Sequence, residues 1–185
     1  MKILVGISGS IGVLGIASYL INLMVEEEVE ELRVLMTPTA ARFVNPQSLE
    51  AILRQPVFVD PWSDGRRLYS PPELVKDLDL YLIAPASATT LSRCAAGSGE
   101  TLVAQCYLCH TGPVAFAPSM SPEMLNHPAV VRNLQRLKES GACILPPGPA
   151  FEAATGTFVL SGTCPYREMW PILKSLVQKP PPEPA

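Results

Sequence analysis

The residues with the clearest chemical potential at the start of this chain are the glycines and serines of GISGSIG, residues 6–12. A short apolar strand is predicted over residues 2–6, and an apolar-periodic stretch after the turn predicts a helix over residues 10–27, capped by Ser10. A strand, a glycine–serine turn and a helix are the elements with which α/β proteins hold a phosphate group at a helix N-terminus. The segment therefore predicts a site for a phosphorylated ligand.

Three further segments carry small and hydroxyl-bearing residues where a predicted strand ends. They are MTPT (36–39), APASATT (84–90) and APSMS (117–121). The carboxyl ends of parallel strands meet at one edge of a sheet, and α/β folds bind their ligands there. Each segment alone could be an ordinary loop or helix cap, but the occurrence of all four together favours a site for a phosphorylated, planar cofactor.

The composition of these segments favours a mononucleotide over a nicotinamide dinucleotide. A nicotinamide site would have an acidic residue at the end of the second strand, where this chain has MTPT. The glycine spacing is also GxxGxxG rather than GxGxxG. The hydroxyls of Ser8, Ser10, Thr37 and Thr39 could bind one phosphate. Phe43, one turn further on, could pack either against a cofactor ring or in the core.

The elements that must position these segments alternate between strands and helices. Strands are predicted at residues 2–6, 32–36, 78–85, 113–119 and 143–148, and helices at 10–27, 46–54, 87–96, 100–109, 128–140 and 166–178. A polar loop is predicted over residues 60–72, and a β-flap or hairpin is predicted over residues 151–163. The alternation predicts one α/β domain over residues 1–178, with a doubly wound parallel sheet of the Rossmann or flavodoxin-like type. Residues 179–185 predict a disordered proline-rich tail.

Composition and charge limit the class of protein. The 185 residues are 48% hydrophobic and 17% charged, which is typical of a globular protein. The net charge of −3, with no long basic run, argues against nucleic-acid binding. Serine and asparagine residues interrupt the N-terminal apolar stretch, which argues against a membrane span or a signal peptide. Five scattered cysteines are typical of free thiols in a reducing compartment, so we expect a cytoplasmic protein.

Four motifs, taken in their order and spacing, give the chain a family resemblance. GISGSI (6–11), TPTAARF (37–43), APASATT (84–90) and PSMSPEML (118–125) resemble the homo-oligomeric flavin-containing cysteine decarboxylases, and the resemblance runs from residue 2 to about residue 163. That family includes the peptidyl-cysteine decarboxylases of lantibiotic and linaridin-type peptide biosynthesis, and phosphopantothenoylcysteine decarboxylase. The resemblance implies FMN as the cofactor, a cysteine-terminated substrate, and assembly into trimers or dodecamers built of trimers.

The resemblance also implies roles for individual residues. It places the phosphate of FMN on Gly9, Ser10, Ile11, Thr37 and Thr39. It places the flavin ring against Phe43, against Ser87, Ala88, Thr89 and Thr90 from the next strand end, and against Ser119 and Met120.

The chain departs from the family pattern in three places. Thr89 stands where the family motif PASANT has asparagine. Ser121 replaces the active-site asparagine of the PxMNxxMW motif, and Leu125 replaces its tryptophan. The family histidine corresponds to Pro71. We therefore expect Ser121 to be the catalytic residue that offers a hydroxyl in place of the lost amide.

Three other side chains could replace part of the role of the missing histidine. His127 follows the second motif by a few residues, and Tyr69 and Glu73 flank Pro71. For each of the three, we favour the interpretation as an ordinary surface residue.

These departures leave several functions open. In the family reaction FMN accepts a hydride from the cysteine side chain and CO₂ then leaves, so the protein mainly orients the substrate. We favour oxidative decarboxylation of the C-terminal cysteine of a ribosomal precursor peptide to an enethiol, for aminovinyl-cysteine formation. The stand-alone length and the loss of both histidine and asparagine favour this enzyme over phosphopantothenoylcysteine decarboxylase. The other alternative is a flavin-binding non-catalytic or regulatory relative.

Two cysteine and methionine patterns are interpreted as structural. CYLCH (106–110) matches the haem-attachment pattern C-x-x-C-H, but it lies in an apolar run that predicts a buried helix end. The remaining cysteines do not have the spacing of a zinc site, so we expect buried structural thiols and no metal. Met120 and Met124, four residues apart, are expected to face one side of a short helix.

Overall fold

The computed structural model describes residues 1–60, 70–152 and 155–178 and is built around a six-stranded parallel sheet. Its strands are β1 (Lys2–Ile7), β2 (Glu31–Met36), β3 (Val57–Val59), β4 (Leu80–Ala86), β5 (Val114–Pro118) and β6 (Cys143–Ile144). They lie in the order β3-β2-β1-β4-β5-β6, and every pairing in the sheet is parallel. The predicted doubly wound α/β fold is confirmed. The predicted tail and most of the predicted loop at 60–72 lie outside the described residues.

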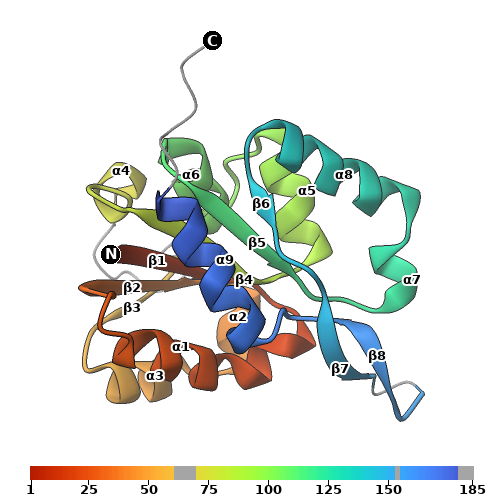
Figure 1. The fold of residues 1–185 in the computed structure, drawn as a ribbon, viewed down its shortest axis with the longest axis horizontal. Coiled ribbons are helices and arrows are strands. Elements are labelled where there is room, and N and C mark those ends of the chain that lie inside the picture. Colours follow the sequence, from red (N-terminus) through yellow and green to blue (C-terminus); the bar gives the residue numbers. More distant parts are fainter. Residues whose placement is uncertain (61–69, 153–154, 179–185) are drawn as a thin grey trace.

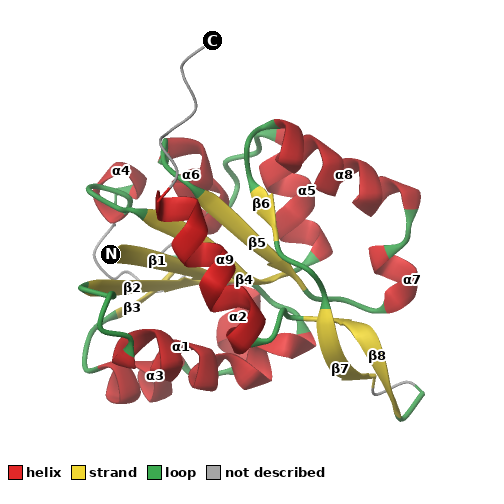
Figure 2. Ribbon diagram, viewed as in Figure 1, coloured by secondary structure: helices red, strands yellow, loops and turns green. Residues whose placement is uncertain are grey.

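Helices cover both faces of the sheet (Figures 1 and 2). One face is covered by α1 (Ile16–Val25), α3 (Pro46–Leu53) and α9 (Tyr166–Gln178). The other face is covered by α4 (Pro71–Leu74), α5 (Ala88–Ala96), α6 (Leu102–Cys109) and α8 (Pro128–Glu139). Two short helices, α2 (Pro38–Phe43) and α7 (Pro122–Leu125), follow β2 and β5 at the carboxyl edge. At the same edge a two-stranded antiparallel hairpin, β7 (Gly148–Glu152) and β8 (Thr157–Gly162), extends from the domain.

The N-terminal helix differs from its prediction. The continuous helix expected over residues 10–27 is instead a 3₁₀ helix, η1 (Ile11–Gly15), followed by α1. Ser10 caps η1 as predicted, since its hydroxyl accepts a hydrogen bond from the Gly12 amide at 3.2 Å. Glycine has a low helix propensity, and two glycines within five residues favour a break here; Gly15 becomes the N-cap of α1.

Two short helices also lie where no helix was predicted. The segment TPTAARF (37–43) forms α2, with Thr37 as its cap and Pro38 at its first position. Likewise Pro71, expected at the end of a loop, begins α4. In both cases a cap residue and a following proline start a helix too short to show a hydrophobic period.

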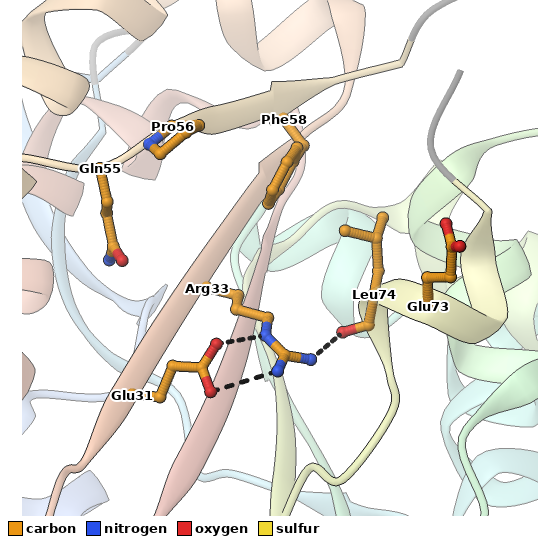
Figure 3. A pocket seen from close by; sticks show the side chains of 7 residues that line it. All are labelled: Glu31, Arg33, Gln55, Pro56, Phe58, Glu73 and Leu74. Carbon is orange, nitrogen blue, oxygen red and sulfur yellow. Dashed lines mark hydrogen bonds and ion pairs between the residues drawn. The ribbon is translucent and has the colours of Figure 1, made fainter. Parts of the chain in front are cut away.

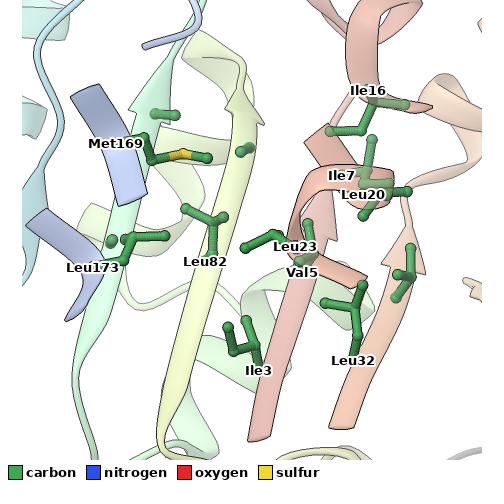
Figure 4. Packing of buried hydrophobic residues seen from close by; sticks show 14 of the residues in the cluster. Ile3, Val5, Ile7, Ile16, Leu20, Leu23, Leu32, Leu82, Met169 and Leu173 are labelled. Atoms are coloured by element: carbon green, nitrogen blue, oxygen red, sulfur yellow. The ribbon is translucent and has the colours of Figure 1, made fainter. Parts of the chain in front are cut away.

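The central strands could be predicted from the sequence because they are buried on both faces of the sheet. Side chains alternate along a strand, so Ile3, Val5 and Ile7 of β1 point to the face under α1 and α9, while Leu4 points to the other. Figure 4 shows Val5 beside Leu23 of α1, and Ile7 beside Ile16 and Leu20 of the same helix. Burial on both faces produces the nearly continuous apolar runs typical of parallel sheets.

Tyr81 is the largest polar side chain that is fully buried in this fold. Its hydroxyl donates a hydrogen bond to the carbonyl of Val103 in α6 at 2.9 Å. On the neighbouring strand the ring lies against Gly6, where a Cβ atom would be 2.6 Å from the Tyr81 hydroxyl. Burial raises the pKa of Tyr81 well above its usual value, and the nearby Cys106 and Cys94 thiols raise it further.

We predict that Tyr81→Phe lowers the free energy of unfolding near neutral pH by about 1–3 kcal/mol, because the Val103 carbonyl is left buried without its donor. The folded-state pKa of Tyr81 lies above the unfolded-state value of about 10, so the wild type loses stability as pH rises through and above 10. The free energy of unfolding of the variant should therefore decline less steeply with pH in that range.

Urea unfolding from pH 7 to 11 measures both effects. Tyr107→Phe, which removes a hydroxyl from a half-buried ring, is the control; equal alkaline slopes for wild type and Tyr81→Phe would contradict the assignment.

Candidate functional site

The carboxyl ends of β1 and β4 are joined through Ser8, whose side chain is fully buried. Its hydroxyl donates to the carbonyl of Pro85 at 2.7 Å and accepts from the amide of Ser87 at 2.7 Å. Its single hydroxyl hydrogen is therefore committed inside the protein. The expectation that Ser8 binds a phosphate is wrong, because the side chain has no solvent-facing donor left to offer.

Gly9 allows the ends of β1 and β2 to approach each other. A Cβ atom on Gly9 would lie 2.3 Å from Cγ2 of Thr39, so only glycine fits without displacing that side chain. Thr39 is exposed, and Thr37 is buried with its hydroxyl accepting from the Ala40 amide at 3.2 Å. The structure thus brings Gly9, Ser10 and Thr39 together, with the predicted ligand Thr37 in the turn before Thr39.

The end of β4 is organised by the cap of α5. The Ser87 hydroxyl accepts from the Thr90 amide at 3.3 Å and lies 3.2 Å from the Thr90 hydroxyl, and Thr90 is buried. Ala88 is half-buried and Thr89 is exposed at this edge. At the end of α2, Phe43 is 47% exposed, so its alternative assignment as a core residue is wrong.

A cavity of about 610 Å³ lies where η1, the end of β5 and the β7–β8 hairpin meet. Of the predicted site residues it is lined by Ile11, Ser119, Met120 and Ser121. The Met120 amide donates to the Ser161 carbonyl at 3.2 Å and so ties the β5 end to the hairpin. The predicted flap is therefore present as a hairpin, and it forms a wall of the cavity. The volume lies in the range of small-molecule binding pockets.

The predicted residues fall into two groups along this edge. One group lines the cavity; the other, consisting of Gly9, Ser10, Thr37, Thr39, Phe43, Ser87, Ala88, Thr89 and Thr90, does not line it. Ser10 and Ile11 are consecutive and connect the two groups. A ligand with a phosphate at one end and a ring at the other is the kind of molecule that spans such an arrangement.

Three hydroxyl groups lie close to Gly12, at the boundary between the two groups of predicted residues. A Cβ atom on Gly12 would lie 2.5 Å from Oγ of Ser119, 2.9 Å from Oγ1 of Thr163 and 3.3 Å from Oγ of Ser10. The Thr163 hydroxyl is buried and has no hydrogen-bond partner among the described residues. An orphaned hydroxyl beside a position that excludes a Cβ fits a polar group of a bound ligand. Sequence reasoning missed Thr163, because it belongs to none of the four motifs.

Ser121 is the cap residue of α7 and lies in the cavity wall. Its hydroxyl accepts from the Met124 amide at 3.4 Å. The pKa of the exposed Glu123 is lowered by its own backbone amide and by the Ser121 hydroxyl. Met120 precedes α7 and lines the cavity, whereas Met124 is 48% exposed on α7, so the prediction that both face one side of a helix is wrong.

The candidates for the missing histidine do not join Ser121. His127 caps α8, with Nδ1 accepting from the Ala129 amide at 3.2 Å, and it does not line the cavity. Glu73 lines a separate cavity of about 290 Å³ with Glu31 and Arg33, at the other end of β2 from the glycine–serine turn (Figure 3). Tyr69 lies outside the described residues.

The Arg33 side chain in that second cavity is fully engaged by the protein. Its guanidinium forms a bidentate ion pair with Glu31, at 2.6 and 3.2 Å, and donates to the carbonyls of Leu74 and Lys76. This geometry explains the cavity as a structural junction between β2 and the segment around α4.

The cysteines separate into buried and accessible thiols. Cys94, Cys106 and Cys164 are buried as predicted, whereas Cys109 is exposed and Cys143 is half-buried, against the prediction. Burial raises the pKa of Cys94 and of Cys106 to about 12, so both stay protonated near neutral pH. Among the residues that the structure describes, no group of three or more His, Cys, Asp or Glu side chains could hold a metal ion.

The comparison with known protein families covers almost the whole chain. The family described as Flavoprotein matches residues 1–179. This chain belongs to the Flavoprotein family. Mersacidin decarboxylase from Bacillus sp. (strain HIL-Y85/54728) is 37% identical over 158 residues, which cover 84% of this chain and 79% of that protein. The coenzyme A biosynthesis bifunctional protein CoaBC of Mycobacterium tuberculosis (strain ATCC 25618 / H37Rv) is 36% identical over 170 residues, but this chain spans only 39% of its length.

Solved structures give the same family assignment. MrsD from Bacillus sp. HIL-Y85/54728 superposes with a TM-score of 0.82 at 28% identity, covering 96% of each chain. SpaF, described as an FMN-dependent cysteine decarboxylase, superposes with a TM-score of 0.80 at 26% identity, also covering 96% of each. The resemblance identified in the sequence is therefore confirmed, and it supports a flavin cofactor. None of the described helices has the length and apolarity needed to cross a membrane; the cytoplasmic location stays a prediction.

We predict that Gly12→Ala weakens flavin binding by about tenfold or more, because the added methyl overpacks the Ser119 and Thr163 hydroxyls at a typical cost of about 1–3 kcal/mol. Gly15→Ala is the matched control in the same 3₁₀ helix, since no atom lies within 4 Å of its Cβ position. Flavin bound per chain and the dissociation constant measure the effect, and circular dichroism checks the fold. Equal losses in the two variants would show that η1 responds to any methyl rather than to this contact.

Proposed function

We propose that this chain is an FMN-dependent enzyme that oxidatively decarboxylates the C-terminal cysteine of a ribosomal precursor peptide to an enethiol, for aminovinyl-cysteine formation. The observation that carries the proposal is the cavity between Ser119–Ser121 and the β7–β8 hairpin, which adjoins the glycine–serine turn at Gly9–Gly12. The similarity to mersacidin decarboxylase and to SpaF supports both the cofactor and the reaction class.

The donor set of the glycine–serine turn fits a phosphate group. Ser10 and Thr37 use hydroxyl lone pairs to cap η1 and α2, so each keeps its O–H hydrogen to donate to an anion. We propose that Gly9, Ser10 and Ile11, with Thr37 and Thr39 from the neighbouring strand end, hold the phosphate of FMN. Phe43, Ser87, Ala88, Thr89, Thr90, Ser119 and Met120 would then border the rest of the cofactor along the same edge.

When bound, FMN would supply the oxidation by accepting a hydride from the cysteine side chain. The residues of the chain bind and orient the peptide terminus. Ser121 accepts the Met124 amide, and its hydroxyl hydrogen, which lowers the pKa of the exposed Glu123, can turn to donate to the thiolate or carboxylate of the substrate. The peptide loses CO₂ and two hydrogens in total, and oxygen takes up the electrons to complete the cycle.

Two other functions have support. Phosphopantothenoylcysteine decarboxylation is favoured by the 36% identity to the CoaBC proteins, which is close to the 37% identity to mersacidin decarboxylase. A non-catalytic, flavin-binding role is favoured by the replacement of the family asparagine and histidine, at Ser121 and Pro71. The assays below separate these functions.

We also propose that the chain acts as a homo-oligomer, a trimer or a dodecamer of trimers. The support within the chain is apolar surface on η1 and α1, where Leu14 is 61% exposed and Val25 is 67% exposed.

We predict that the purified protein is yellow and releases non-covalent FMN on denaturation, and that Ser10→Asp abolishes binding. A carboxylate is a good helix cap, so the fold should survive, but its charge would face the phosphate dianion. Ser10→Asn, which has the same shape without the charge, is the control and should retain FMN. Absorption spectra and the FMN content after denaturation measure the result. A colourless protein that cannot be reconstituted, or one that retains FAD, would refute the cofactor assignment.

We predict that a peptide ending in free cysteine loses CO₂ and two hydrogens while the flavin is reduced, and that Ser121→Ala lowers kcat/KM by about ten- to hundredfold, because a hydrogen bond to a charged group is lost. Flavin content should stay unchanged. Ser121→Asn keeps both a cap and a donor and should remain active, and His127→Ala should have little effect. Mass spectrometry and anaerobic flavin bleaching measure turnover.

The same assays decide between the functions. Abolished activity in His127→Ala together with a silent Ser121→Ala would reverse the residue assignment. Turnover of phosphopantothenoylcysteine but of no cysteine-terminated peptide would establish the second function. Full FMN occupancy without turnover of either substrate would favour the non-catalytic role.

A further inference from the structure

The described lining of the cavity next to Ser121 carries a negative charge that no basic side chain balances. Of the described residues that line it, Glu152 is the one charged side chain, and no lysine, arginine or histidine is among them. The remaining lining is apolar or carries hydroxyls, as at Phe151, Ser121 and Thr163. A carboxylate in a partly enclosed cavity with few other charges acts more strongly on a bound ligand than a carboxylate on open surface.

The Glu152 side chain is held in place on the hairpin. It is half-buried at the end of β7, and its Oε2 atom accepts a hydrogen bond from the Thr155 hydroxyl at 2.7 Å. The Thr155 hydroxyl in turn lies 2.8 Å from that of Thr157 on β8. None of the described residues donates a hydrogen bond to Oε1 or forms an ion pair with the group. The carboxylate is thus fixed by the hairpin while one oxygen is available to a ligand.

A second negative charge lies at the Ser121 side. Glu123, two residues after the lining residue Ser121, keeps a lowered pKa and is therefore ionised near neutral pH. It belongs to α7, which packs against β8. Glu123 is exposed and is not among the lining residues, so the charge within the described lining comes from Glu152.

We infer that Glu152 determines the charge preference of the substrate: it favours a peptide with a basic residue at one of the two positions before the terminal cysteine, and it disfavours a substrate with an added anionic group. The inference rests on the proposed function, since it assigns the cavity to the cysteine-terminated substrate. The cavity of about 610 Å³ exceeds what a flavin ring and a single cysteine fill together, so the preceding residues of the peptide share it. The phosphate of phosphopantothenoylcysteine would meet a carboxylate there without a counter-cation from the described lining.

Binding can be measured apart from turnover with peptides that end in serine, which lack the reacting sulfur. Three peptides carry lysine, glutamine or glutamate at the first position before the terminus, and three carry them at the second. Titration calorimetry with the FMN-loaded protein should show about fivefold tighter binding of lysine than of glutamine, and about fivefold weaker binding of glutamate, at one of these positions. The difference should shrink as salt is added.

Two variants assign the preference to Glu152. Glu152→Gln should remove the difference, and Glu152→Lys should reverse it, with flavin content unchanged in both. Glu27→Gln removes the same charge beyond the C-terminal end of α1, at the opposite edge of the sheet, and should keep the wild-type pattern. In parallel, pantothenoylcysteine should bind more tightly than its phosphorylated form to the wild type, and this gap should close in Glu152→Gln.

The outcomes separate this inference from the proposed function. Charge preferences that are the same in the wild type and in Glu152→Gln, or no binding of any of the peptides, would overturn the inference. Charge-dependent binding through Glu152, without turnover of the matching cysteine-terminated peptides, would support the inference and refute the proposed reaction.

Discussion

The arrangement of the site depends on the buried Ser8 hydroxyl between the ends of β1 and β4. These two strands are neighbours at the point where the strand order reverses, and α/β folds bind ligands at such a point. Because the hydroxyl donates to Pro85 and accepts from Ser87, it fixes the two following turns relative to each other. The glycine–serine turn and the start of α5 are therefore held in place before any ligand binds, which lowers the ordering cost of binding.

The serine and threonine hydroxyls at the carboxyl edge of the sheet act as helix N-caps. Ser10, Thr37, Ser87 and Ser121 are all N-caps whose oxygens accept from backbone amides. Capping alone would explain serine and threonine at all four strand ends, so their presence does not by itself distinguish a cofactor site from four ordinary helix starts. Thr163 differs from these four residues: it caps no helix, and its buried hydroxyl lacks a partner among the described residues. A polar group of a bound ligand in the cavity would supply that partner.

Elements with a local sequence pattern could be predicted, whereas residues that only tertiary contacts bring to the site could not. The strands β1 and β4 were predictable because burial on both faces leaves an unbroken apolar run, and α9 because it keeps a helical period over its whole length. The break after η1 was not, because two glycines in an otherwise apolar stretch can be tolerated in a helix or can end it. Motifs located Ser119 and Ser121, but Glu152 and Thr163 reach the cavity only through docking of the hairpin, and that tertiary contact leaves no local pattern.

The lack of a cation in the described cavity lining has a consequence for the proposed chemistry. Decarboxylation moves the negative charge away from the substrate carboxylate, into the thioaldehyde that becomes the enethiolate, as CO₂ leaves. An arginine or lysine paired with that carboxylate would stabilise the bound substrate more than the transition state and would slow the step. A neutral donor such as the Ser121 hydroxyl orients the group with a weaker bond, which is easier to give up. A serine at the position of the family asparagine is thus compatible with turnover, provided that the hairpin, rather than a salt bridge, supplies most of the substrate binding.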